Sequence, residues 1–391
     1  MDFTFTEEQQ AATEAARAVF SGVVPDGVPS PALVPGAVAE DIDRPLWARL
    51  ASGDLLSLTL SPEHGGAGLD LVALCLVLRE SAKVLARVPL LETYAVAMAL
   101  QRYGDARLAA ELLPRVGRGE LVLTVGANGS TGHDPAELAV TARREAHAKS
   151  NRPGEADGDA AGWVLDGVQS GVPWAQAADW IAVPAHTGKG QAVVALIRPT
   201  HDGVTLAEQV STSGELFAEL RLDSVRIDSN ALIDTAGAWE WLRALLTTGT
   251  CALALGLGEA VLTMTSEYTG KREQFGFPVA TFQSVAVQTA DRYIDLRAME
   301  VTLWQAAWRI STGAGGALPA EGDTAVAKIW ASDGVRRVVQ TAQHLHGGFG
   351  ADTDYPLHRF HAWAKQIELS LGPAAAHEQA LGDLLATHLL S

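Results

Sequence analysis

Residues 272–283 read Arg-Glu-Gln-Phe-Gly-Phe-Pro-Val-Ala-Thr-Phe-Gln, and residues 344–350 read His-Leu-His-Gly-Gly-Phe-Gly. The first stretch combines the guanidinium of Arg272 with the amides of Gln274 and Gln283, which are groups that bind phosphate oxygens and ribose hydroxyls. Glycines in the second stretch leave no Cβ to block a ligand. Each piece alone also fits a solvated helix end or an ordinary turn. Together they predict a clamp for a phosphate and a purine.

The pattern of apolar residues around these stretches changes twice along the 391-residue chain. Residues 1 to about 120 carry helical periodicity, and helical periodicity returns after about residue 234. The segment between them contains short apolar runs separated by Gly, Pro, Asp and Asn, which is typical of strands and turns. The sequence therefore predicts an α+β fold in the order helices, strands, helices.

Individual elements follow from the same patterns. Helices are expected at 7–20, 44–54 and 69–85, and the almost continuously apolar run 252–265 predicts a helix that is buried on most sides. Strands are expected at 121–124, 163–165, 180–183, 192–197 and 216–225. The polar stretch 141–161 has too few apolar residues to pack and is expected to be a surface loop.

In this order and spacing, the stretches resemble the acyl-CoA dehydrogenase family over the full length of the chain. The turn at 63–68 and the segments 222–227 and 325–330 are also similar to family members. The resemblance implies an N-terminal helical domain (1–120), a middle β domain (121–233) and a C-terminal four-helix bundle domain (234–391). It also implies FAD as the cofactor, held by a clamp that reaches across a dimer interface into the neighbouring subunit's site.

The resemblance assigns cofactor contact to the residues of the clamp. They are Arg272, Gln274, Phe275, Phe282, Gln283, His344, His346, Gly347, Gly348, Phe349 and Gly350. One position departs from the family, in which a glutamine commonly stands two residues before the histidine of the Gly-Gly turn. This chain has His344 there and Gln343 one step earlier, so an adenine contact at this point is less well supported than the glycine turn.

The catalytic carboxylate of the family is not found at either of its usual positions. Family members remove the α-proton of a thioester with a glutamate, and alignment places Leu371 and Leu246 where that glutamate occurs. Leucine cannot accept a proton, and a general base must lie within hydrogen-bond reach of the proton that it removes. The carboxylates near these positions, Glu240, Glu259 and Glu368, are interpreted as helix-surface or capping charges.

Two loops of the β segment depart from the family as well. Residues 124–130 read Thr-Val-Gly-Ala-Asn-Gly-Ser where relatives have Thr-Glu-Pro-Gly-Ala-Gly-Ser, and residues 171–173 read Gly-Val-Pro where relatives place Trp-Ile-Thr against the flavin ring. These changes remove stacking area, a hydroxyl and a backbone donor. They predict that the chain's own flavin pocket is unfilled.

Loss of the base with retention of the clamp resembles the non-catalytic chain of the heterotetrameric acyl-CoA dehydrogenases of steroid-degrading bacteria, as do the segments 350–360 and 366–372. The resemblance implies an α2β2 assembly with a homologous catalytic subunit, FAD shared with that partner, and α,β-desaturation of a bulky acyl-CoA such as a steroid side chain. The isolated chain is then expected to be inactive. The alternatives are a complete homotetrameric dehydrogenase using Glu368 as base and a flavin-free scaffold protein of the same fold.

Composition limits the other classes of function. A net charge of −17 without a basic cluster argues against nucleic acid and anionic membranes as partners. Apolar runs are interrupted before the roughly 18 residues of a membrane span, and the start has no secretion-signal pattern, so we expect a cytoplasmic protein. Cys75 and Cys251 are expected to be packed thiols. A metal site at His344, His346, His358 and His361 is disfavoured, because no cysteine or paired carboxylate shares a ligand-like spacing with them.

Overall fold

The computed structural model describes residues 4–25, 42–131, 137–145 and 162–388. The N-terminal part is helical: α1 (Glu7–Phe20), α2 (Arg44–Ser52), α3 (Leu71–Ala82), α4 (Leu90–Tyr103) and α5 (Ala106–Gly117). Thr6 forms a capping box with Gln9 at the start of α1, and aspartates accept hydrogen bonds from the first turns of α2, α3 and α5. The helices expected at 7–20, 44–54 and 69–85 are confirmed, with ends that shift by at most three residues.

The middle of the chain forms one mixed sheet in the described residues. Its strands are β1 (Leu123–Val125), β2 (Val140–Arg144), β3 (Trp163–Pro173), β4 (Trp180–Thr187), β5 (Ala192–Ile197), β6 (Val204–Val210), β7 (Leu216–Ile227) and β8 (Leu232–Ile233). The strand order is β6-β7-β3-β2-β4-β5-β8, and β1 pairs with β4 in parallel. The register between β3 and β7 shifts between Gln169 and Val172, which bends β3 just before residues 171–173.

The prediction of a loop over 141–161 is wrong at its beginning. Residues 141–144 belong to β2, which pairs with both β3 and β4, and its side chains alternate between buried and exposed positions. Strand pairing with segments distant in the sequence therefore outweighs the polar local composition. The remainder of the predicted loop, residues 146–161, lies outside the described residues.

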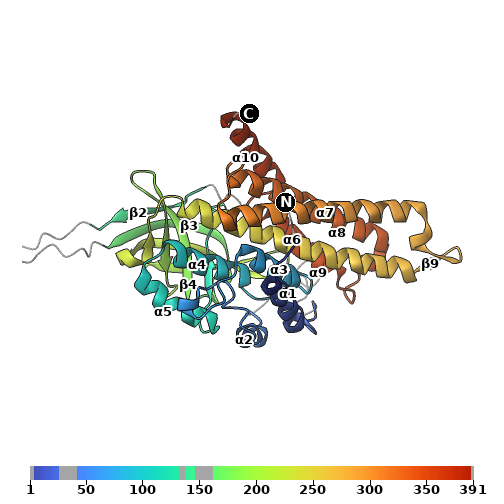
Figure 1. Cartoon of the computed structure of the whole chain (residues 1–391), viewed down its shortest axis with the longest axis horizontal. Helices are drawn as coiled ribbons and strands as arrows, with labels where there is room; N and C mark the ends of the chain where they lie inside the picture. Colours follow the sequence, from blue (N-terminus) through green and yellow to red (C-terminus); the bar gives the residue numbers. More distant parts are fainter. Residues whose placement is uncertain (1–3, 26–41, 132–136, 146–161, 389–391) are drawn as a thin grey trace, which may run out of the picture.

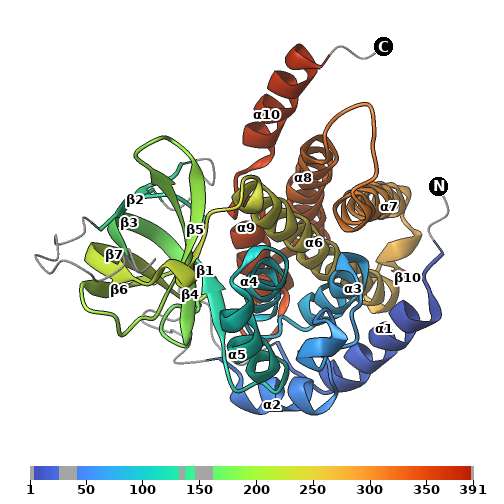
Figure 2. The same cartoon turned by 60° about the vertical axis from the view of Figure 1, so that its left-hand side comes forward.

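Five helices follow in the described C-terminal part: α6 (Ala238–Lys271), α7 (Gln283–Thr312), α8 (Ala320–His346), α9 (Leu357–Leu369) and α10 (Ala374–Thr387). Helix α6 is their centre and packs against α3, α4, α7, α8 and α9. A Cβ at Gly256 of α6 would lie 2.0 Å from the carbonyl oxygen of Arg79 on α3, so the absence of a side chain permits this close approach. Figure 2 shows the sheet on one side, the N-terminal helices below and the long C-terminal helices beside them.

By length and composition, α6 is the one helix in the described ranges that could cross a membrane. Its most apolar window of 18 residues has a mean hydropathy of 1.6, so the apolar runs are less interrupted than the sequence analysis expected. However, 78% of that window is buried inside the structure, as in the core helix of a soluble protein.

Cys75 on α3 and Cys251 on α6 are free and buried, which confirms that they are packed thiols.

Candidate functional site

The first half of the predicted clamp is a β-hairpin at the C-terminal end of α6. Strands β9 (Glu273–Gln274) and β10 (Phe277–Pro278) pair in antiparallel fashion, and the hairpin lies at the tip of the long α6–α7 pair (Figure 1). Both turn residues have positive φ, 55° at Phe275 and 83° at Gly276. A bulky residue is strained in this conformation, which occurs preferentially at functional positions. The hairpin holds the Phe275 ring outward, with 89% of the residue exposed.

The second half of the clamp, the turn at 346–350, packs against the last turns of α6. The Tyr268 ring stacks on the His346 ring at 4.3 Å and on the Phe349 ring at 5.4 Å between centroids. Tyr268 lies one helical turn before Arg272. The structure therefore brings the two stretches singled out in the sequence to the same end of the molecule.

Within this turn, the predicted contact residues differ in their surroundings. His346 is buried, and its ring nitrogens contact the Ala342 carbonyl oxygen at 2.8 Å and the Tyr355 hydroxyl at 3.0 Å. Burial lowers the pKa of His346, which favours the neutral ring. A Cβ at Gly347 or Gly348 would meet no atom within 4 Å, and both are exposed. The open face of the turn is thus the Gly347–Gly348 peptide, with His346 beneath it.

Gly350 and Gln343 support the turn from within. A Cβ at Gly350 would lie 2.9 Å from the Gln343 amide nitrogen, so packing accounts for this glycine. The Gln343 amide donates to the Gly347 carbonyl oxygen at 3.0 Å, while the neighbouring His344 is exposed. Phe349 keeps 44% of its surface exposed beside the glycines.

The polar side chains at and beside the hairpin are open to solvent. Arg272, Gln274 and Gln283 are all exposed, and no described residue forms an ion pair with the Arg272 guanidinium. The Gln274 amide donates to the Glu273 carbonyl oxygen at 2.8 Å, and the Phe282 ring meets the edge of Phe275 at 6.3 Å between centroids. An exposed guanidinium at the same end of the molecule as open glycine backbone provides the kinds of groups that bind phosphate.

A cavity of about 110 Å³ lies where the N-terminal helices, the sheet and the C-terminal helices meet. Leu246 of α6 and Leu371, just after α9, both line it. The structure thus brings together the two positions at which the family it resembles carries its base. Both side chains are buried, with 3% and 6% of their surfaces exposed.

The loops around this cavity are bonded to one another. The Thr124 hydroxyl donates to the Pro173 carbonyl oxygen at 2.6 Å, and the Asn128 amide donates to the Gly171 carbonyl oxygen at 3.1 Å. The Asn128 carbonyl oxygen also accepts from the backbone N–H of Leu371 at 3.4 Å. These polar groups are therefore engaged within the chain. At about 110 Å³, the cavity is smaller than typical ligand pockets, which usually measure roughly 300–1,000 Å³.

The cavity is also lined by two carboxylates, Glu92 and Glu215. Neither was identified from the sequence. Burial raises the pKa of Glu92 to about 7, although the Trp174 side chain favours the charged form. Burial also raises the pKa of Glu215, against the opposing effect of the Arg87 guanidinium at 2.8 Å. A single acid in the apolar helix Leu90–Tyr103 is a sequence signal for Glu92; no local signal indicates that Glu215 reaches this cavity.

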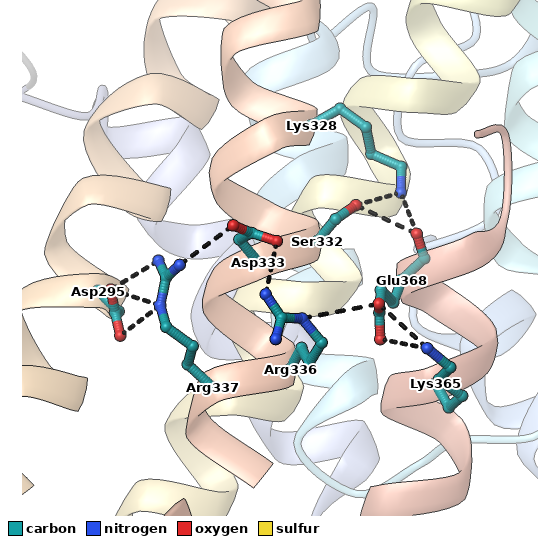
Figure 3. A network of polar contacts seen from close by, with 8 residues as sticks. All are labelled: Asp295, Lys328, Ser332, Asp333, Arg336, Arg337, Lys365 and Glu368. Carbon is teal, nitrogen blue, oxygen red and sulfur yellow. Dashed lines mark hydrogen bonds and ion pairs between the residues drawn. The ribbon is translucent and has the colours of Figure 1, made fainter. Parts of the chain in front are cut away.

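Glu368, the alternative base, is directed elsewhere. Figure 3 shows its carboxylate between Lys365 at 3.1 Å and Arg336 at 3.8 Å, in a network that continues through Asp333 and Arg337. It is not among the residues that line the cavity. Its carboxylate is held by these cations away from the cavity, and only 12% of its side chain is exposed, so it is more buried than a helix-surface charge would be.

Close to Glu368, the buried side chain of Lys328 closes the end of α9. Its ammonium donates to the Ser332 hydroxyl at 2.8 Å and to the carbonyl oxygens of Ile367 and Glu368 at 3.2 and 3.0 Å. Burial lowers the pKa of Lys328 to about 8. Because these carbonyls end α9 directly before the turn of Leu371, Lys328 fixes the position of that turn.

The remaining candidate carboxylates and histidines of the sequence analysis lie elsewhere in the fold. Glu259 lies between Arg79 and Lys83 in an ion-pair network, and Glu240 lies in the first turn of α6. Both agree with their interpretation as helix-surface or capping charges. The His358 ring contacts the Tyr355 carbonyl oxygen at 2.8 Å. Across the described ranges, no group of three His, Cys, Asp or Glu side chains is arranged to hold a metal ion.

Comparison with known proteins places this geometry in a family. Residues 6–120 match the acyl-CoA dehydrogenase N-terminal domain, and residues 246–384 match the acyl-CoA dehydrogenase C-terminal domain. Acyl-CoA dehydrogenase FadE27 of Mycobacterium tuberculosis is 32% identical over 391 residues, which cover 99% of each chain. FadE28 of the same organism is 29% identical over 98% of each chain.

Solved structures give the same result. A chain in the crystal structure of the ChsE4–ChsE5 complex from Mycobacterium tuberculosis has a TM-score of 0.86 and 33% identity, covering 99% of both chains. A chain in a variant of the Tcur3481–Tcur3483 steroid ACAD has a TM-score of 0.86 and 36% identity over 98% of this chain and 99% of that one. With its helices, sheet and helices in the expected order, this chain belongs to the acyl-CoA dehydrogenase family.

Proposed function

We propose that this chain is a subunit of a heteromeric, FAD-dependent acyl-CoA dehydrogenase, in which a homologous catalytic chain supplies the base. In this α2β2 assembly the chain lends its clamp to the FAD of the partner and carries out no chemistry in its own cavity. The cytoplasm as its location stays a prediction.

One observation carries this proposal: the clamp and the cavity lie at distant points of the same helix. Leu246 on α6 and Arg272, the C-cap of the same helix, are 26 positions apart, which at 1.5 Å per residue corresponds to about 39 Å. The exposed clamp is thus far from the chain's own cavity and is free to serve a site on another subunit. The two leucines in the cavity support the absence of a base in this chain.

The roles of the individual residues follow from their surroundings. Arg272 is proposed to pair with the pyrophosphate, with the Gln274 and Gln283 amides on phosphate or ribose oxygens. Phe275, Phe282 and Phe349 would pack against the adenosine, with His344 at the same edge. Gly347 and Gly348 would let the backbone approach the cofactor, while His346 and Gly350 hold the turn in place. When bound, FAD would accept the hydride from the β-carbon of the acyl group.

The identity of partner and substrate rests on the relatives. One similar structure is a ChsE4–ChsE5 complex, and another is a steroid ACAD made of two differently named chains. We infer that the partner is a homologous acyl-CoA dehydrogenase subunit and that the substrate is a bulky acyl-CoA, such as a steroid side chain. The reaction would be α,β-desaturation.

Flavin content tests the proposal. The tagged chain is purified alone and, separately, with the chain that co-purifies from its native cell; flavin absorbance and turnover of acyl-CoA with an artificial electron acceptor are then measured. The expected result is a colourless, inactive isolated chain and a yellow, active complex. Leu371→Glu in the isolated chain should not create activity, because a base without an oriented flavin has no hydride acceptor beside it.

The other two functions give different results in the same experiment. A complete homotetrameric dehydrogenase would purify yellow and active alone, and Glu368→Gln would abolish its turnover. A flavin-free scaffold would stay colourless in both preparations. Either outcome would contradict the heteromeric proposal.

A further inference from the structure

Trp174 stands in the wall of the chain's own cavity, directly after the residues that replace the family's ring-contacting element. It lines the same cavity as Leu246, Leu371 and Glu92, and its side chain favours the charged form of the Glu92 carboxylate. Glu92 belongs to α4, whereas Trp174 follows β3. The lining of the cavity therefore includes both a residue of the N-terminal helices and a residue that follows the sheet.

The backbone of Trp174 shows that this placement is imposed by its surroundings. Its φ is 57°, a left-handed conformation that is unfavourable for a large side chain. Such residues persist only where the surrounding structure holds them. Here the hydrogen bonds of Thr124 to Pro173 and of Asn128 to Gly171 fix the preceding residues.

We propose that Trp174, held by Glu92, closes this chain's own cavity, so that a side chain of the protein excludes the flat aromatic ring of a flavin. The closure leaves a void of about 110 Å³, below the volume of an ordinary cofactor pocket. This cavity is formed by residues of this chain alone. The proposal rests on the proposed function only for the identity of the excluded ligand.

The raised pKa of Glu92 agrees with this closure. Burial disfavours the charged form of its carboxylate, and the Trp174 side chain opposes this effect. Glu215, the other carboxylate of the cavity, has Arg87 as its partner. Glu92 is therefore the acidic side chain of the cavity that is assigned to Trp174 in this closure.

The test removes the indole from the isolated full-length chain. Trp174→Gly suits the left-handed backbone and opens the cavity. The probe is lumiflavin, which carries the isoalloxazine ring without phosphate, and binding is followed by quenching of its fluorescence. We expect the variant to bind lumiflavin at least about tenfold more tightly than wild type, the effect of one well-packed aromatic contact.

A matched control enlarges the same cavity from another wall. Trp363 of α9 also lines the cavity, and its indole nitrogen is buried without a hydrogen-bond partner among the described residues. Trp363→Ala should leave the contact between Trp174 and Glu92 intact and should not admit lumiflavin. Equal binding by both variants, or by neither, would overturn the proposal, and so would tight binding by wild type.

A second pair of variants covers the case in which Trp174→Gly does not fold. Glu92→Gln keeps an acceptor oxygen for the indole, whereas Glu92→Leu removes it. We expect lumiflavin binding to rise in Glu92→Leu and to stay at the wild-type level in Glu92→Gln. No difference between the two would contradict the role of Glu92. Since none of these assays involves a partner subunit, their failure leaves the proposed function of the clamp untouched.

Discussion

At the scale of single residues, Lys328 is a buried cation whose partners are backbone carbonyls and a hydroxyl. Its ammonium satisfies the carbonyl oxygens of Ile367 and Glu368 at the end of α9. Leaving such buried acceptors unsatisfied costs about 1–3 kcal/mol. A residue with no direct part in chemistry is thereby important for the turn that carries Leu371.

Lys328→Met should therefore lower the free energy of unfolding by about 1–3 kcal/mol, measured by urea denaturation of the isolated chain. Lys365→Met is the control, because Lys365 contacts Glu368 at the surface with half of its side chain exposed. Exposed ion pairs contribute roughly 0–1 kcal/mol. Equal effects of the two substitutions would show that Lys328 does not hold the end of α9.

Glu92 predicts a dependence of stability on pH. Its pKa is about 7 in the folded chain against an ordinary value of 4.5, so the folded state binds more protons than the unfolded state between these values. The carboxyl therefore reduces stability as pH rises from about 4.5 to about 7, by at most about 3 kcal/mol.

Glu92→Gln removes this titration and keeps the side-chain volume. Its stability relative to wild type should rise between pH 4.5 and pH 7 by up to about 3 kcal/mol in urea denaturation at the two pH values. A difference between variant and wild type that is the same at both pH values would show that the carboxyl is not desolvated in the folded chain.

At the scale of elements, the turn at 346–350 contains one glycine that is required for packing and another that has free space around its Cα. A Cβ at Gly350 would lie about as close as 2.9 to 3.0 Å to three neighbouring side chains, whereas a Cβ at Gly348 would meet none within 4 Å. The two glycines therefore have different requirements, although they stand two positions apart.

Gly348→Val should leave the melting temperature of the isolated chain near that of wild type but lower the flavin content of the heteromer, because its side chain would occupy the space of the cofactor. Gly350→Ala should lower the melting temperature, because its Cβ would press on Gln343, His346 and Leu357. Thermal unfolding and flavin absorbance check both. Full flavin content in a folded Gly348→Val complex would show that this turn does not face the cofactor.

The elements also show how far the sequence alone predicts the structure. Helical periodicity predicts the buried part of α6, and the glycines predict the turn at 346–350, because both are local patterns. Strand β2 and the meeting of Trp174 and Glu92 in the lining of one cavity were not predicted. Each depends on segments far apart in the sequence, and neither the polar composition of β2 nor the positive φ of Trp174 can be read from neighbouring residues.

At the scale of the whole molecule, the chain has two ends with opposite properties. At one end of α6, three parts of the chain meet around a cavity with leucines in place of a base and a tryptophan in its wall. At the other end, an exposed hairpin and an open glycine turn lie together. Helix α10 stands out from the rest in both views and has no buried residue (Figures 1 and 2). This arrangement supports a subunit that assists another subunit's site.

Flavin affinity of the heteromer tests this account most directly. Arg272→Ala is compared with Lys271→Ala, which removes the neighbouring exposed cation at the same helix end. Both complexes are co-purified with the partner, checked for subunit ratio, and dialysed against a series of FAD concentrations. The account predicts intact assembly in both, and FAD binding that is weaker in Arg272→Ala by on the order of ten- to a hundredfold, the effect of losing a charge-assisted hydrogen bond. An Arg272→Ala complex that binds FAD as tightly as the Lys271→Ala complex would contradict it.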